Sequence, residues 1–358
     1  MINKISIENL RSFARVEVDQ LARFNVFLGR NGVGKTTLLE AFSIAASGGN
    51  PLAVMATCRR RDLPPANPQS DLALRSIFHN GRPKLSPRIS FVSDGDECEV
   101  TIEPRFEFKS SDGAVEMQSN TSETTEESQI VGLSIAFRVG TKSGRQSFQV
   151  SRDSSRPRGT IEFTERSGPA IPVPSAFTVQ ARQATSATET ADMLGRLFQR
   201  GKEDLFLKFM SVIRDDIIAV NSSVRAGETV ISIKTKSGTR LLNEMGDGFC
   251  RLALFATGIL GGRCKLIDVD EIDSGLHRSI MPSVWQGLRE LAKSQSFQLV
   301  STTHNEGMLE TALDSFEDAQ DEIAVFRLDP DIVGQPRVVR YSWEELKYSV
   351  ESGVDPRG

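Results

Sequence analysis

The sequence predicts an α/β fold: a mostly parallel sheet covered by helices, joined to an N-terminal antiparallel β subdomain. Two observations lead to this prediction. From residue 247 onward, short apolar runs typical of strands alternate with stretches whose apolar residues recur every three or four positions. Residues 88–163 instead contain six short runs with a period of two and many Phe residues, which is typical of antiparallel strands. No heptad pattern is long enough to predict a long coiled coil.

Composition excludes several classes of protein. The 358 residues include 39% hydrophobic and 25% charged ones, which suits one large or two closely packed globular domains. The net charge of −4 excludes the general basic excess of an autonomous nucleic-acid binder, so any such contact would be local. The four cysteines contain no close CxxC pair, which argues against a zinc site. No leader and no uncharged apolar run of membrane-spanning length is present, so we expect a cytoplasmic protein without membrane contact.

The N-terminal part is predicted to begin with a pair of strands and a buried strand over residues 24–28. A glycine-rich turn follows, and a helical pattern runs from Lys35 to the Gly48-Gly49 pair. Six prolines predict that residues 51–87 are rich in loops. A segment rich in Ser, Thr and Glu, residues 110–128, is predicted to be a mobile loop.

The C-terminal part is predicted to be helical over residues 186–220 and then to alternate between strands and helices. A capping box from Ser342 to Glu345 opens the last predicted helix. The expected elements after residue 220 are a strand at 230–233, a helix at 247–260, a strand at 266–269, a helix through 280–291, a strand at 297–302, a further helix, and a strand at 323–328. We therefore expect an N-terminal lobe over residues 1–165 and a C-terminal lobe over residues 166–358, which together form one unit.

Residues 29–36 fit the phosphate-binding pattern GxxxxGK[ST], after an apolar strand and at the start of a helix. Glycines let backbone N–H groups turn toward phosphates, and the helix N-terminus adds partial positive charge. Lys35 is expected to reach the β and γ phosphates, and the Thr36 hydroxyl to bind Mg²⁺. The predicted nucleotide-binding residues are Arg30, Asn31, Gly32, Val33, Gly34, Lys35, Thr36 and Thr37.

Two adjacent carboxylates, Asp270 and Glu271, end the apolar run of residues 265–269, as in a Walker B motif. Asp270 is expected to hold the Mg²⁺ hydration shell, and Glu271 to act as general base on the attacking water. Asp268 lies within the strand itself, where a carboxylate is costly unless it is hydrogen-bonded or faces a cleft.

Three further features are candidates for binding phosphate. Gly246, Asp247 and Gly248 form a glycine turn that opens a helix, which suits either an anion or an ordinary turn. His304 follows a strand and is a candidate to contact the γ-phosphate or the attacking water. The basic run from Arg59 to Arg61 could meet phosphates, but the pattern favours a solvated loop edge.

Together these motifs resemble the SMC-like branch of ABC-type ATPases, which includes the recombination and repair clamps and the overcoming-lysogenization-defect (OLD) type proteins of phage defence. The resemblance implies an ABC-type P-loop NTPase head with ATP and Mg²⁺ as cofactors. Gly246 to Gly248 then correspond to the signature, and His304 to the switch histidine. The Met-Gly-Asp-Gly signature lacks the usual serine, and only Gln180 and Gln183 are candidates for the Q-loop glutamine.

The resemblance also implies partners. Each active site would be shared, with Lys35, Thr36, Asp270, Glu271 and His304 of one head facing the signature of another, in a homodimer or a higher oligomer of dimers. The residues after His304 lack an acidic cluster for a nuclease site, so we expect a separate effector, a nuclease or a toxin, switched by this ATPase in anti-phage defence. The alternatives are a DNA repair or recombination clamp and a lone P-loop kinase or GTPase.

Overall fold

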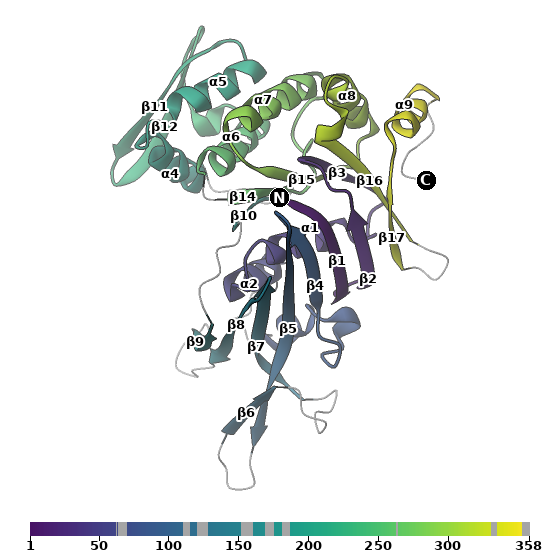
Figure 1. Ribbon diagram of the computed structural model, residues 1–358. Helices are drawn as coiled ribbons and strands as arrows, with labels where there is room; N and C mark the ends of the chain where they lie inside the picture. The colour runs from purple at the N-terminus through teal and green to yellow at the C-terminus, as the bar shows by residue number, and fades with distance from the viewer. Residues whose placement is uncertain are drawn as a thin grey trace.

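The structure is a computed structural model, shown in Figure 1. It describes residues 1–61, 63, 70–109, 115–119, 128–151, 160–168, 175–180, 187–262, 264–330 and 335–352. Two large sheets dominate it, and the helix that follows the phosphate-binding loop, α1 (Lys35–Ala45), lies between them and contacts both (Figure 1).

A six-stranded sheet positions the predicted site. Its strand order is β10-β14-β15-β3-β16-β17, and every neighbouring pair is parallel except the edge hairpin of β16 and β17. The strands are β3 (Phe24–Leu28), β10 (Ser175–Val179), β14 (Cys264–Val269), β15 (Gln298–Thr302), β16 (Ile323–Pro330) and β17 (Pro336–Arg340). All residues of the central strands β3 and β15 are buried, because both faces of the sheet are covered there.

The second large sheet is antiparallel and has eight strands in the order β2-β1-β4-β5-β7-β8-β9, with β6 paired to β5. Its strands are β1 (Ile2–Leu10), β2 (Phe13–Asp19), β4 (Arg88–Ser93), β5 (Asp96–Lys109), β6 (Val115–Ser119), β7 (Ile130–Val139), β8 (Lys142–Ser151) and β9 (Thr160–Ser167). Phe91, Phe106, Phe137 and Phe148 are buried on its inner face, as the sequence predicts. Phe163 is an exception, since it is 59% exposed on the edge strand β9.

The remaining elements pack around the two large sheets or extend from them. A three-stranded antiparallel sheet consists of β11 (Ile217–Arg225), β12 (Glu228–Thr235) and β13 (Gly238–Leu241). The other helices are α2 (Pro51–Arg59), α3 (Ser70–Arg75), α4 (Ala187–Phe198), α5 (Glu203–Ile213), α6 (Asp247–Leu260), α7 (Met281–Ser294), α8 (Glu306–Phe316) and α9 (Trp343–Ser352). Short 3-10 turns are η1 (His79–Gly81), η2 (Leu242–Glu244), η3 (Arg278–Ile280) and η4 (Gln320–Glu322).

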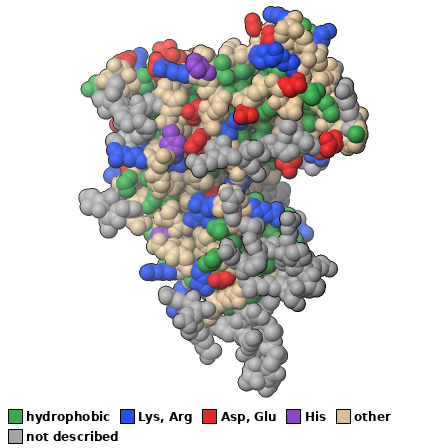
Figure 2. Space-filling model, turned by 180° about the vertical axis from the view of Figure 1, so that it is seen from behind, with side chains coloured by type: hydrophobic (Ala, Val, Ile, Leu, Met, Phe, Trp, Pro, Cys, Tyr) green, Lys and Arg blue, Asp and Glu red, His purple; other side chains and the backbone are tan. Residues whose placement is uncertain are grey.

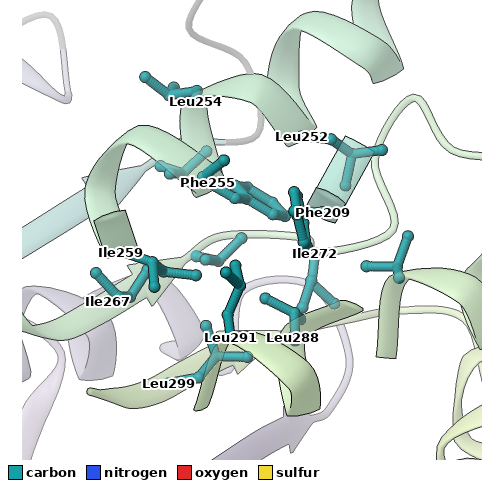
Figure 3. Packing of buried hydrophobic residues seen from close by; sticks show 14 of the residues in the cluster. Phe209, Leu252, Leu254, Phe255, Ile259, Ile267, Ile272, Leu288, Leu291 and Leu299 are labelled. Carbon is teal, nitrogen blue, oxygen red and sulfur yellow. The ribbon is translucent and has the colours of Figure 1, made fainter. Parts of the chain in front are cut away.

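The main core lies between the parallel sheet and the helices α5 to α7. Figure 3 shows Phe255 and Ile259 of α6, Leu288 of α7 and the strand residues Ile267 and Leu299 converging there. All five side chains are buried. This packing fixes the position of α6, whose first turn carries the predicted signature.

Three predictions about local structure are wrong. Residues 51–87 contain α2 and α3, because Pro51 occupies the first turn of a helix, where proline is tolerated, and the Asn50 side chain accepts the Leu52 N–H as N-cap. Residues 115–119 form the strand β6, so the prediction of a mobile loop over 110–128 is wrong there, whereas residues 110–114 and 120–127 lie outside the described residues. The helical stretch predicted to reach residue 220 ends at Ile213, and β11 begins at Ile217.

The capping box predicted for the last helix is confirmed: Ser342 and Glu345 each accept the other's backbone N–H with their side chains. The sequence predicted no strand between β16 and α9, and β17 was therefore missed. None of the helices in the described ranges combines the length and the apolar character that crossing a bilayer requires.

Candidate nucleotide-binding site

The predicted motifs surround one cavity of about 450 Å³ at the carboxyl ends of the parallel strands. Its lining residues are Ser12, Asn31, Gly32, Gly34, Lys35, Thr36, Thr37, Leu39, Arg60, Arg61, Thr178, Gln180, Asp268, Asp270, Glu271 and His304. The phosphate loop, the paired carboxylates and the histidine are thus brought together across 269 positions of sequence. The predicted residues that do not line this cavity are Arg30, Val33, Gly246, Asp247 and Gly248.

The phosphate loop follows β3 and leads directly into α1. Gly34 caps the helix with a φ of +106°, and a Cβ there would lie 2.3 Å from a ring carbon of Phe13, so only glycine fits. Lys35 donates from Nζ to the carbonyl oxygens of Gly29 (2.6 Å) and Arg30 (2.9 Å). The first turn of α1 has no acidic residue, so its free N–H groups and helix dipole favour an anion.

Thr302, at the end of β15, joins the two predicted carboxylate residues. Its hydroxyl donates to Oδ1 of Asp270 (2.7 Å) and accepts the backbone N–H of Glu271 (2.9 Å). The residue is fully buried. The motifs in the sequence did not identify Thr302, because its role depends on contacts with residues of a neighbouring strand end. The structure shows that it fixes the end of β14 next to β15.

Glu271 has a φ of +50°, in the left-handed region that residues other than glycine rarely adopt. Its carboxylate oxygen Oε1 lies 3.6 Å from Nε2 of His304. Nδ1 of the same histidine lies 3.4 Å from the Lys35 ammonium. Burial and the Lys35 charge lower the pKa of His304, against the opposing effect of the nearby carboxylates, so the ring is neutral near pH 7. A neutral ring can accept from Lys35 at Nδ1 and carry its proton at Nε2, toward Glu271.

Asp268 is fully buried inside β14. It is both hydrogen-bonded and next to a cleft, the two conditions under which a carboxylate is expected to be tolerated in such a strand. The hydroxyls of Ser43 and Thr178 both donate to Oδ2, each at 2.7 Å, and Asp268 lines the cavity. Burial raises the pKa of Asp268 to about 6, although the Arg60 guanidinium 3.8 Å from Oδ1 acts in the opposite direction.

The prediction of a solvated loop edge is wrong for Arg60, whereas Arg61 is exposed and also lines the cavity. Arg60 is 14% exposed and donates to Ser43 and Thr178. Arg61 pairs with Glu40 (2.9 Å) and donates to the Thr37 hydroxyl (3.2 Å). Arg59 is exposed. A run of charges does not indicate which of its members face the cavity, because that depends on how α2 packs. No other signal in the sequence identifies Arg60 and Arg61 as the members that do.

The signature segment lies outside the cavity. Gly246 has a φ of +90°, and a Cβ there would meet nothing within 4 Å, so the turn is open. Gly248 is instead packed: a Cβ would lie 2.4 Å from the carbonyl oxygen of Gly275, in the turn after the paired carboxylates. Gln180 follows β10 and lines the cavity, whereas Gln183 lies outside the described residues.

The cavity offers the kinds of ligand that magnesium prefers. The Thr36 hydroxyl and the Asp270 carboxylate both line it, and Asp270 is already oriented by Thr302. Oxygen donors with room for water and phosphate are the usual surroundings of Mg²⁺ in nucleotide sites. The donor set therefore fits a magnesium nucleotide.

Two solved structures share the fold over almost the whole chain. The SMC head bound to the C-winged helix domain of ScpA has a TM-score of 0.53 at 14% identity, covering 97% of this chain and 99% of that one. The Smc head domain with an extended coiled coil, bound to the C-terminal domain of ScpA derived from Pyrococcus furiosus, has a TM-score of 0.53 at 12% identity and covers 98% of each. The chain has the SMC head-like fold of ABC-type P-loop ATPases, with no long coiled coil in its described part.

Curated proteins are similar over very different lengths. An ATP/GTP phosphatase of Helicobacter pylori is 20% identical over 340 residues, 87% of each chain. The Rad50 ATPase for DNA double-strand break repair of Methanopyrus kandleri is 49% identical over 45 residues, and the chain spans only 5% of its length. The DNA replication and repair protein RecF of Bacteroides thetaiotaomicron is 42% identical over 55 residues, 15% of its length.

One family model covers most of the chain. The model described as "AAA domain, putative AbiEii toxin, Type IV TA system" matches residues 24–310, which include the phosphate loop, the signature segment, the paired carboxylates and His304. This range is well over half of the 358 residues. The chain belongs to this family of AAA ATPases.

Proposed function

We propose that this chain binds ATP with Mg²⁺ and hydrolyses it to ADP and phosphate at a site shared between two copies. The observation that carries the proposal is the convergence of Lys35, Thr36, Asp270, Glu271 and His304 on one cavity, with the signature segment outside it. The ATP/GTP phosphatase of Helicobacter pylori, similar over most of both chains, supports hydrolysis.

Each residue has a defined task. The phosphate loop N–H groups and Lys35 bind the β and γ phosphates, which takes the Lys35 ammonium from the carbonyl oxygens of Gly29 and Arg30. Thr36 and Asp270 would hold a magnesium ion, which would supply positive charge next to the phosphates. Glu271 orients the attacking water and accepts its proton at the carboxylate. His304 stays neutral and presents Nε2 to the same region.

The signature segment supports a dimer. Gly246 is open to its surroundings and Gly246 to Gly248 do not line their own cavity, so their free N–H groups are available to a nucleotide on another copy. We propose a homodimer, or a higher oligomer of dimers, in which residues 1–165 and 166–358 act as the two lobes of one head. The lone kinase or GTPase alternative gives this turn no task.

Turnover measured against protein concentration tests the shared site. The rate of phosphate release per chain should rise with concentration and then level off, because an active site forms only when two copies meet. Lys35→Ala should abolish ATP binding, and Gly246→Ala should retain binding but lose turnover. A rate per chain that is independent of concentration would contradict the shared site.

We further propose that the ATPase is a switch or scaffold for a separate effector, a nuclease or toxin, in anti-phage defence, as for the OLD-type proteins it resembles. The family description, which names an AbiEii toxin and a Type IV TA system, supports the defence part of this proposal. In cells that express the chain from its own operon, Lys35→Ala should raise phage plating efficiency. Equal plating on wild-type and variant cells would contradict a role in defence.

A DNA repair or recombination clamp is the second candidate, favoured by the local similarity to Rad50 and RecF. Among the described side chains on the face drawn in Figure 2, both acidic and basic ones occur, and the basic ones do not merge into a single area. A clamp would need a basic groove across the dimer, and duplex DNA should then stimulate ATP turnover at physiological salt. We expect no such stimulation.

A further inference from the structure

Arg251, in the second turn of α6, holds the backbone at the ends of two strands. Its guanidinium donates to the carbonyl oxygens of Gln180 after β10 (2.5 Å), and of Asp270 and Glu271 after β14 (3.0 Å for Glu271). It also lies over the Phe255 ring, 5.6 Å from the centroid, one turn further along α6. One side chain thus joins the signature helix to the strand that ends in the predicted general base.

The backbone that Arg251 holds is strained. Glu271 has a φ of +50°, and such a conformation costs on the order of 1–3 kcal/mol unless its surroundings enforce it. Two neighbours enforce it from opposite sides of the residue. The Thr302 hydroxyl accepts the Glu271 N–H, and Arg251 donates to the Glu271 carbonyl oxygen.

Arg251 acts through the backbone and not on the nucleotide. It does not line the described cavity, although Gln180, Asp270 and Glu271 do. Three carbonyl oxygens accept from its donors, and α6 is fixed against the core by the buried Phe255 and Leu252 (Figure 3). Gly248 makes a second close approach, to Gly275, from the start of the same helix.

We propose that Arg251 is a positioning residue that holds Glu271 in the conformation required of the general base and ties it to the signature helix of the same chain. This inference rests on the proposed ATP hydrolysis. The helix α6 begins at the signature segment, which in the proposed dimer contacts the nucleotide of the partner. Arg251 therefore links this segment to the general base of the chain's own site.

Steady-state kinetics on Arg251→Met, which keeps the stem but removes the guanidinium, tests the proposal. We expect kcat to fall about 10- to 100-fold while the affinity for ATP stays within about threefold of wild type. Arg251→Lys restores the positive charge but not the planar guanidinium with its several donors, so it should recover part of kcat. If the Met variant does not fold, the Lys variant is measured in its place. Unchanged kcat in both variants, or losses of kcat and affinity that match, would overturn the proposal.

Arg289→Met is a matched control. Arg289 also lies over a phenylalanine ring, Phe316 at 5.2 Å, and also donates to a carbonyl oxygen, that of Ser315, but it does so between α7 and α8. Its replacement removes a ring contact, one hydrogen bond to a carbonyl oxygen and an ion pair with Asp318, all away from the cavity. We expect kcat of this variant to equal that of wild type.

A double-mutant cycle with Glu271→Gln separates positioning from a general effect. If Arg251 acts through Glu271, the single-turnover rate of the double variant should match that of Glu271→Gln alone within about twofold. Effects that multiply would overturn the proposal. Wild-type protein that fails to hydrolyse ATP would overturn the proposed function itself, whereas active wild type with fully active Arg251→Met overturns only the role of Arg251.

Discussion

Single hydroxyl groups hold the candidate catalytic residues in place. Thr302 satisfies an oxygen of Asp270 and the N–H of Glu271 at the same time, and Ser43 and Thr178 together solvate the buried carboxylate of Asp268. Buried polar groups of this kind are costly to leave unpaired. The site therefore depends on residues that do not touch the nucleotide in the proposed mechanism.

Replacing Thr302 by Val should impair catalysis more than binding. The change keeps the shape but leaves the Asp270 oxygen and the Glu271 N–H unpaired. We expect ATP turnover to fall about 10- to 100-fold with ATP affinity nearly unchanged, measured by phosphate release and by titration with a fluorescent ATP analogue. Thr311→Val is the control, because its hydroxyl donates only to Met308 within α8. Equal turnover in the two variants would contradict the role of Thr302.

The buried Asp268 carboxyl should make the free energy of unfolding depend on pH between about 4 and 6. Burial raises the pKa of Asp268 to about 6 in the folded protein from the ordinary 3.8 of an exposed aspartate, so its stabilising contribution is complete below about pH 4 and is lost as the pH rises through 6. Relative to Asp268→Asn, the free energy of unfolding of wild type should fall by about 3 kcal/mol between pH 4 and 7. Urea denaturation across this range measures it. A difference that is constant or rises with pH would contradict the raised pKa.

At the scale of elements, α1 is fixed to its neighbours by a buried charge cluster. Glu40, near the middle of the helix, pairs with Arg11 at the β1–β2 turn (2.6 Å) and with Arg61 after α2 (2.9 Å). The Glu40 side chain is 1% exposed. The helix that presents Lys35 is thus held against both the antiparallel sheet and the basic segment beside the cavity.

Neutralising Glu40 should therefore be far more damaging than neutralising a surface partner. Glu40→Gln leaves Arg11 and Arg61 without their countercharge and should cost about 3–5 kcal/mol in the free energy of unfolding. Glu17→Gln breaks the exposed pair with Arg15 and should cost less than about 1 kcal/mol. Urea denaturation of both variants measures the difference. Similar losses in the two would show that the cluster does not fix α1.

The sequence predicted elements best where local patterns and tertiary packing agree. The phosphate loop, α6 and the capping box of α9 are examples, since each is specified by glycines, caps and apolar spacing within a few residues. Prediction was wrong at α2, where Pro51 was taken as a loop signal although it occupies a helix start. The contacts of Arg60 and Arg251 could not be predicted, because no local pattern encodes the packing that creates them. Arg60 contacts Thr178, 118 residues away, and Arg251 contacts Asp270, 19 residues away.

At the scale of the whole molecule, the groups of the proposed shared site lie in two separate places on the chain. The cavity gathers groups for binding, metal coordination and proton transfer, while the open signature turn faces elsewhere. In the proposed dimer each chain supplies both parts. Arg251 then connects the signature helix, which contributes to the partner's site, directly to Glu271 in the chain's own site.

Size-exclusion chromatography with light scattering on Glu271→Gln tests the central claim most directly. The variant retains every proposed nucleotide contact but lacks the general base, so ATP with Mg²⁺ should give a stable species of twice the mass of the chain. ADP, or ATP with the additional change Lys35→Ala, should leave a single chain. A variant that binds ATP yet remains a single chain at concentrations well above its affinity for ATP would contradict the shared site.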